Sequence, residues 1–174
     1  YPFSNEKSEI NFSNPKISSI TIDAHKMLQA PYGTGVFICR KGLIENVLTK
    51  EAEYVEGMDL TLCGSRSGAN AVAVWMILFT YGPYAWYEKI SILMMRTQFL
   101  TKELDALGIA YYNCPFMNIV TIKADFVPEK IANKFGLVPQ QHNENNKWYK
   151  IVLMDHVEVE HLTNFIDEMK ASKN

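Results

Sequence analysis

The residues best suited to covalent chemistry lie in one short segment, Asp23-Ala24-His25-Lys26. Lysine attacks a carbonyl carbon as the free amine, so a lysine that forms a Schiff base must be accessible and must lose its proton easily. Partial burial in a cleft and a cation beside the lysine, here His25, both favour the neutral amine. We therefore predict that Lys26 is the catalytic residue. Without its neighbours, Lys26 would more simply be a solvated lysine at a strand edge.

Two predicted strands hold this segment in place. Residues 17–22 are β-branched and alternate polar with apolar side chains from Ser19 onward, and residues 36–39 form a second strand-like run. Lys26 would follow the first strand, and the glycines at 33 and 35 would turn the chain into the second. A short helix is expected near residues 43–49.

Two helices are predicted on either side of Gly82-Pro83. The loop 64–68 opens an apolar helix over residues 69–81, and helical spacing of apolar residues continues over 84–107, where Gly108 supplies a C-terminal cap. The first helix is apolar on all sides, so we expect it to be buried in a complete protein and to expose apolar surface in this chain alone. We place a domain boundary at Gly82-Pro83, which gives domains 1–82 and 83–174.

The rest of the chain alternates strands with helices. Strands are predicted at 118–123 and 148–154, and helices at 128–135 and up to about residue 170, the last begun by a capping box at residues 155–158. Along the second strand, Lys150 shares a face with Trp148, Val152 and Met154, because side chains alternate faces. This order predicts a small α/β layer.

Three segments together resemble a known family, the group II decarboxylases that depend on pyridoxal phosphate (PLP). Residues 19–35, with His25-Lys26 after a strand, resemble the family's lysine segment. Residues 61–68, with Gly64-Ser65-Arg66 before a helix, resemble its Gly-Ser/Thr-Arg segment. Residues 150–157 resemble its final strand and helix start. The likeness is strongest to the C-terminal part of the archaeal-type tyrosine/aspartate decarboxylases and covers nearly the whole chain.

The resemblance implies a fold and an activity. The fold is α/β: the end of the large PLP-binding domain of an aspartate-aminotransferase-like (fold type I) enzyme, followed by a small C-terminal α/β domain. The activity is that of a carboxy-lyase, which converts an L-amino acid such as tyrosine, aspartate or glutamate to the amine and CO2. Aromatic and acidic substrates both remain open.

The resemblance also implies roles for single residues. Lys26 would hold the cofactor, His25 would lie near its phosphate, and Asp23 would fix the turn that presents the lysine. Further contacts to the phosphate or to a neighbouring subunit would come from small and polar residues, namely Gly33, Thr34, Ser65 and Arg66. The alternatives are a turn histidine at position 25, and a helix cap and a surface charge at positions 65 and 66.

Two residues are candidates for binding the substrate. Many relatives carry an arginine at the position of Lys150, and that arginine would bind the α-carboxylate. Lysine is a point charge and lacks the flat bidentate fork of arginine, so this departure weakens the assignment. Tyr54 lies in a loop where relatives carry a tyrosine, although simple packing is the more ordinary role.

The chain has only 25 residues before Lys26, whereas relatives place three further parts of the site upstream. These are a ring stacked on the cofactor, an aspartate at its pyridine nitrogen, and a phosphate-binding loop. We therefore expect a fragment, a cleavage product or one part of a split enzyme, which alone would be a poor catalyst. The partners implied are the missing N-terminal half and a second copy in a homodimer. The alternatives are a carbon–carbon lyase of the sphingosine-phosphate lyase type and a non-catalytic structural subunit.

The composition argues against several other classes of protein. The formal net charge is −2 and the basic residues are scattered, which argues against a nucleic-acid partner. The most apolar stretch, residues 69–81, is too short to cross a membrane. The three cysteines are far apart, lack metal-ligand spacing and are odd in number, so we expect no metal and reduced thiols in a cytoplasmic protein.

Overall fold

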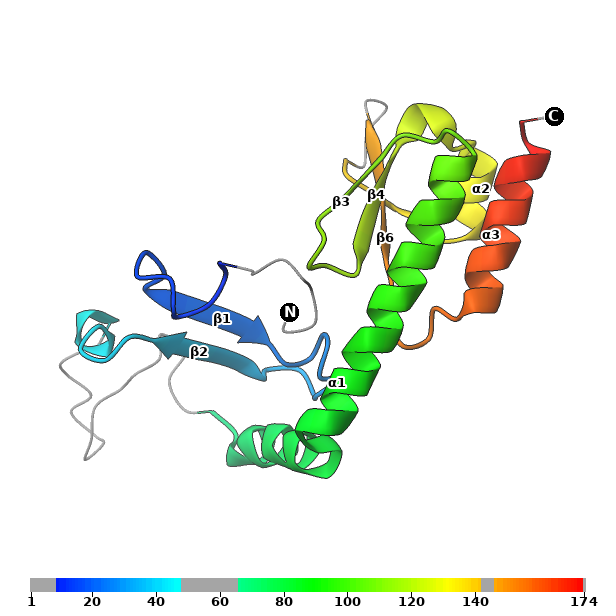
Figure 1. The fold of residues 1–174 in the computed structure, drawn as a ribbon. Coiled ribbons are helices and arrows are strands. Elements are labelled where there is room, and N and C mark those ends of the chain that lie inside the picture. The colour runs from blue at the N-terminus through cyan, green and yellow to red at the C-terminus, as the bar shows by residue number, and fades with distance from the viewer. Residues whose placement is uncertain (1–8, 48–65, 142–145, 174) are drawn as a thin grey trace. The chain divides into compact units, whose positions relative to one another are not determined.

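The predicted strand pair is present at the start of the chain. A computed structural model describes residues 9–47, 66–141 and 146–173. In it β1 (Ser19–Asp23) pairs antiparallel with β2 (Gly35–Cys39), so that Asp23 lies opposite Gly35 (Figure 1). A 3-10 helix, η1 (Ile44–Val47), stands where a short helix was expected. The candidate lysine therefore lies in the connection between two paired strands.

The two predicted helices are both present, and they meet at a kink within one element, α1 (Gly68–Ala106). The expected break is a kink within it, because Gly82 has φ 60° and ψ 178°. Glycine adopts positive φ without a steric penalty, and Pro83 contributes no N–H to the helical hydrogen bonds. The chain divides into two compact units, Ser8–Tyr84 and Ala85–Asn174. The predicted domains, 1–82 and 83–174, stay a prediction.

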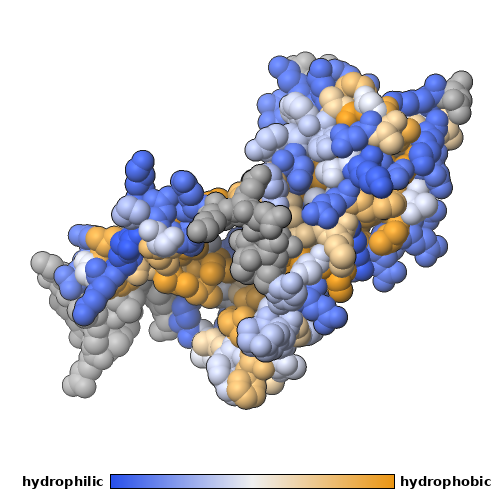
Figure 2. All heavy atoms as spheres, in the orientation of Figure 1, coloured by the Kyte–Doolittle hydropathy of each residue, from blue (hydrophilic) through white to orange (hydrophobic). Residues whose placement is uncertain are grey.

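The first half of α1 carries an exposed apolar stripe. Val72, Trp75, Met76 and Phe79 are spaced as one helical face, and each exposes between 54 and 74% of its surface. Trp75 and Phe79 stack with ring centroids 5.1 Å apart. Figure 2 shows further apolar residues at the surface over β1 and β2. The burial expected for this helix in a complete protein is thus not found among the described residues. The apolar exposure expected of this chain alone is found.

A four-stranded antiparallel sheet organises the second unit, with strand order β3-β4-β6-β5. The strands are β3 (Tyr111–Asn113), β4 (Ile119–Lys123), β5 (Val138–Pro139) and β6 (Trp148–Val152). The predicted strands at 118–123 and 148–154 correspond to β4 and β6, and the short β3 and β5 were not predicted. A 3-10 turn, η2 (Ala124–Phe126), leads to α2 (Glu129–Lys134), and α3 (Val159–Ala171) ends the chain.

The core of this unit lies between the sheet and its helices. Alternate residues of the strands face inward: Val120 and Ile122 of β4 are fully buried, and Ile151 of β6 is nearly so. They pack against apolar side chains of all three helices, namely Leu100, Leu104, Ile131, Ala132, Leu162, Phe165, Ile166 and Met169. Lys150 lies on the opposite, exposed face of β6, as the alternation predicted. The second unit therefore has a complete hydrophobic core of its own.

The predicted capping box at residues 155–158 is wrong by three positions. Glu158 is the N-cap residue of α3, and its backbone N–H donates to Nδ1 of His161 at 3.3 Å. The Asp155 carboxylate pairs instead with Nζ of Lys89 at 2.6 Å, and Arg96 donates to the Asp155 carbonyl. These tertiary contacts compete with local capping. No helix in the described ranges is both long and apolar enough to span a membrane.

Candidate active site

Lys26 is presented by a turn that the backbone holds in place. The Lys26 N–H donates to the Asp23 carbonyl at 3.0 Å, which closes the turn after β1. Ala24 is fully buried; its N–H donates to the Thr34 carbonyl, and its own carbonyl accepts from Ala30. The Lys26 side chain leaves this framework and exposes 66% of its surface. The sequence thus produces a fixed backbone with an accessible amine.

An ion pair joins the two ends of the turn. Nζ of Lys26 donates to Oδ2 of Asp23 at 2.6 Å. This hydrogen bond, and after it the positive charge of Lys26, hold the pKa of the Asp23 carboxyl below its ordinary value of 3.8. Asp23 therefore stays ionised in neutral solution.

His25 has an unsatisfied polar atom inside the same turn. Its Nδ1 is buried and has no hydrogen-bond partner among the described residues. The imidazole stacks on the ring of Tyr32, with centroids 5.1 Å apart and planes inclined by 24°. Buried polar atoms are nearly always paired in folded proteins, so an unpaired one next to Lys26 is a position where a ligand atom would be stabilised.

The loop after Lys26 is tied to the first turn of α1. The Asn70 side-chain amide donates to the carbonyls of Tyr32 (3.3 Å) and Gly33 (3.4 Å). Gly33 has φ 81°, and a Cβ there would lie 3.1 Å from Nδ2 of Asn70, so a larger residue would be strained. The Thr34 hydroxyl is buried and donates to the Pro31 carbonyl at 2.6 Å. Thr34 thus uses its side chain to shape the loop, which leaves backbone groups to meet a ligand.

Asn70 is a positioning residue that the sequence interpretation missed. It follows the Gly64–Gly68 loop by two residues, and a polar side chain in the first turn of a helix was the available signal. Arg66 precedes α1 with an exposed side chain. Ser65 and Tyr54, predicted to contact cofactor and substrate, lie outside the described residues. The structure therefore brings Asp23, His25, Lys26, Gly33 and Thr34 together around one loop.

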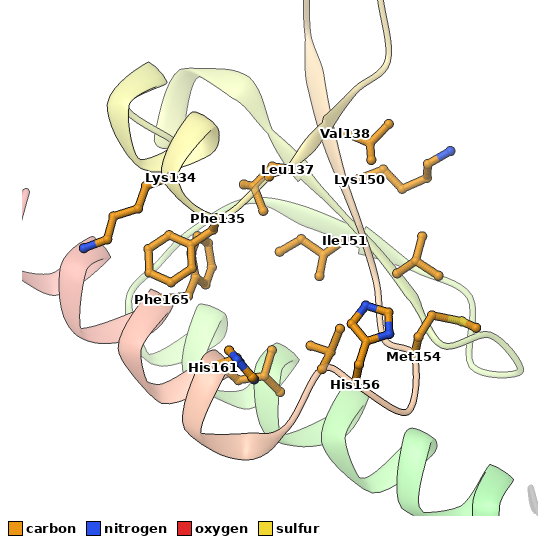
Figure 3. Close-up of a pocket in the computed structure, with 14 residues that line it drawn as sticks. Lys134, Phe135, Leu137, Val138, Lys150, Ile151, Met154, His156, His161 and Phe165 are labelled. Carbon is orange, nitrogen blue, oxygen red and sulfur yellow. The ribbon is translucent and has the colours of Figure 1, made fainter.

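Lys150 belongs to the second compact unit and lies opposite Thr121 of β4 and Val138 of β5. It lines a pocket of about 500 Å³ with Phe165, His156 and His161. Its ammonium points away from the aromatic rings and the histidines (Figure 3). Within the described ranges no cluster of three His, Cys, Asp or Glu side chains is placed to hold a metal ion.

No protein-family model matches the sequence, but comparison with single proteins finds similar amino-acid decarboxylases. The chain is 55% identical over 170 residues to the tryptophan decarboxylase of Clostridium sporogenes, covering 98% of the chain and 41% of that protein. It is 31% identical over 176 residues to a probable L-tyrosine/L-aspartate decarboxylase of Methanococcus maripaludis, covering 95% of the chain and 44% of that protein. The chain thus spans less than half the length of these relatives.

Solved structures share the fold at low sequence identity. A sphingosine-1-phosphate lyase of Burkholderia pseudomallei matches with a TM-score of 0.79 and 16% identity, over 99% of this chain and 41% of that one. The L-methionine decarboxylase of Streptomyces sp. 590 matches with a TM-score of 0.66 and 20% identity, over 89% of this chain and 32% of that one. The predicted fold class and the resemblance to amino-acid decarboxylases are confirmed.

Proposed function

Because this chain is homologous to part of the PLP-dependent amino-acid decarboxylases, we propose that it is the C-terminal part of such an enzyme, with Lys26 as the residue that attaches the cofactor. The observation that carries the proposal is 55% identity to a tryptophan decarboxylase over 98% of the chain. The accessible amine of Lys26 on a backbone-fixed turn supports the assignment of that residue.

The residues around Lys26 fit a phosphorylated aldehyde. The unpaired buried Nδ1 of His25 can take a hydrogen bond from, or donate one to, a bound group next to Lys26. The close approach of Asn70 to Gly33 leaves space only for backbone there. We assign phosphate contacts to His25 and to backbone N–H groups near Gly33 and Thr34, with Ser65 and Arg66 as further candidates.

When bound, PLP supplies an electron sink for the electron pair left as the carboxylate departs. The chain's residues would do the rest. Lys26 would hold the cofactor and, when not attached to it, could hold a proton beside the reacting carbon. Lys150 would bind the α-carboxylate, since it is an exposed cation for which the described residues show no ion pair. Tyr54 is a further candidate for a substrate contact.

The substrate we propose is an aromatic L-amino acid, with tryptophan tested first because the 55% identical relative is a tryptophan decarboxylase. Tyrosine and aspartate follow from the 31% identical relative. We also propose that the complete protein contains an upstream half, works in the cytoplasm and forms a homodimer. The exposed stripe Val72, Trp75, Met76 and Phe79 supports a covering partner, because large exposed apolar patches mark interaction sites.

Two alternatives have different consequences. The first alternative is a carbon–carbon lyase, because a sphingosine-1-phosphate lyase shares the fold with a TM-score of 0.79. Such an enzyme would cleave a carbon–carbon bond in a phosphorylated substrate and would leave amino acids unchanged. A non-catalytic subunit would act on neither substrate.

The experiment is a decarboxylation assay on the complete protein with added PLP and L-tryptophan, in which the amine product is measured by chromatography. We expect turnover that Lys26→Ala abolishes and that Lys41→Ala, an exposed lysine in the same unit, preserves. Amine release that survives in Lys26→Ala would overturn the assignment. Absence of amine with every amino acid tested would favour one of the two alternatives.

A further inference from the structure

The ion pair between Asp23 and Lys26 is separate from the framework that holds the turn. The turn is closed by backbone bonds of Lys26, Ala24 and Ala30, none of which uses the Asp23 side chain. The contact that the structure gives the Asp23 carboxylate is Nζ of Lys26, at 2.6 Å. The Asp23 side chain therefore contacts the lysine directly, and its expected role in fixing the turn stays a prediction.

We infer that Asp23 is a positioning residue that holds the Lys26 ammonium in place whenever Lys26 carries no cofactor. This inference rests on the proposed function of Lys26 and adds a role for the residue three positions before it. The charged groups that act on the Asp23 carboxylate are Lys26 and, more weakly, His25. The hydrogen bond of 2.6 Å holds Nζ of Lys26 against the carboxylate, beside the turn.

The consequence concerns the step that attaches the cofactor. The Lys26 ammonium must first release a proton to water; the free amine then adds to the cofactor's aldehyde carbon, a C=N bond replaces the C=O bond, and the oxygen leaves as water. Breaking the pair with Asp23 precedes this addition. The carboxylate would thus slow attachment of the cofactor. While Lys26 carries no cofactor, the carboxylate would hold the Lys26 ammonium group beside the turn, close to where the cofactor attaches again.

The test uses the cofactor-free complete protein, so that it does not depend on catalysis. Limiting acetic anhydride labels free amines, and peptide mapping gives the ratio of label on Lys26 to label on Lys41, an internal reference. The variants are Asp23→Asn, which keeps the shape and removes the charge, and Asp23→Glu, which keeps the charge. Asp125→Asn is the matched control, because it removes an exposed ion pair with Lys123 (3.4 Å) in the other unit.

We expect Asp23→Asn to raise the Lys26-to-Lys41 ratio by about two- to fivefold, as an exposed ion pair permits. Attachment of PLP to Lys26 at neutral pH should be faster by the same factor. Asp23→Glu should lie nearer the parent protein, and Asp125→Asn should match it. An unchanged ratio in Asp23→Asn would overturn the inference and leave the proposed function untouched. Failure of PLP to attach at Lys26 in every variant would instead overturn the proposed function.

Discussion

The two compact units are held together in different ways. Among the described residues of Ser8–Tyr84, the buried side chains are those of Ala24, Ala30 and Thr34. Order there comes from hydrogen bonds: Arg40, for example, donates from Nε to the Ile17 carbonyl (2.8 Å) and from Nη2 to the Asn14 carbonyl (2.7 Å). Ala85–Asn174 instead contains the whole cluster of large buried side chains. Among the described residues, the unit that contains Lys26 therefore has few buried side chains, whereas the other unit has a packed core.

The largest effect expected from this difference is in hydrogen exchange. In this chain alone, amides of β4 and β6 should exchange about a thousandfold more slowly than those of β1 and β2, because only the former are covered by a packed core. In the complete protein the protection of β1 and β2 should rise. Equal protection of the two sheets in the chain alone, measured by mass spectrometry, would remove the contrast.

The next largest effect expected is on the free energy of unfolding, which a core substitution in the second unit should lower. Leu104 of α1 is fully buried in the second unit, so Leu104→Ala should lower its free energy of unfolding by about 3 kcal/mol. Leu43→Ala, at an exposed leucine of the first unit, is the control and should change it by less than about 0.5 kcal/mol. Urea denaturation is followed by tryptophan fluorescence in a Trp75→Phe background, in which the remaining tryptophans, Trp86 and Trp148, both lie in the second unit. A comparable loss from Leu43→Ala would contradict the account.

Lys150 tests whether the second unit also contributes to the site. Loss of a charge-assisted hydrogen bond to the substrate carboxylate should raise KM about tenfold in Lys150→Met, while Lys150→Arg should be tolerated. Lys123→Met, at another exposed lysine of the same sheet, is the matched control. If kcat/KM for Lys150→Met stays within about threefold of the parent, carboxylate recognition lies elsewhere.

The smallest effects expected are those of pH, and they have opposite signs in the two units. The pKa of Asp23 is lowered in the folded chain, so its contribution to stability is present above pH 3.8 and is lost as the pH falls through the folded value. Burial, and then a hydrogen bond with Asp105, raise the pKa of Tyr111 above 10.0, so stability is lost as the pH rises past that value. Asp23→Asn should remove the acid effect alone and Tyr111→Phe the alkaline effect alone, in thermal melts across pH. A single variant that changes the melting temperature at both acid and alkaline pH would contradict the assignment of one effect to each unit.

Much of this architecture was predictable where the signal is local. Strand-like runs of residues predicted β1, β2, β4 and β6, and Gly82-Pro83 marked the kink of α1. The strands β3 and β5 have three and two residues, too few for a periodic pattern, and pairing with distant strands creates them. The start of α3 was misplaced because Asp155 is drawn to Lys89, a contact 66 positions away in the chain.

The candidate site, too, could be predicted from the sequence only where the signal is local. The His25-Lys26 pair and the glycine turn stood out by residue type and spacing. Asn70 could be noticed as a polar residue in the first turn of α1, but its partner, the Gly33 carbonyl, lies 37 positions away and is indicated by no local pattern. The burial of the Thr34 hydroxyl and the unpaired Nδ1 of His25 likewise follow from how the loop folds back on the turn.

The central claim is that Lys26 attaches the cofactor, and one measurement tests it most directly. The complete protein is incubated with PLP, reduced with borohydride and digested, and the modified peptide is identified by mass spectrometry. The account predicts a single stable adduct on Lys26, absent from Lys26→Ala. An adduct found instead on another lysine, such as Lys41 or Lys50, would contradict it.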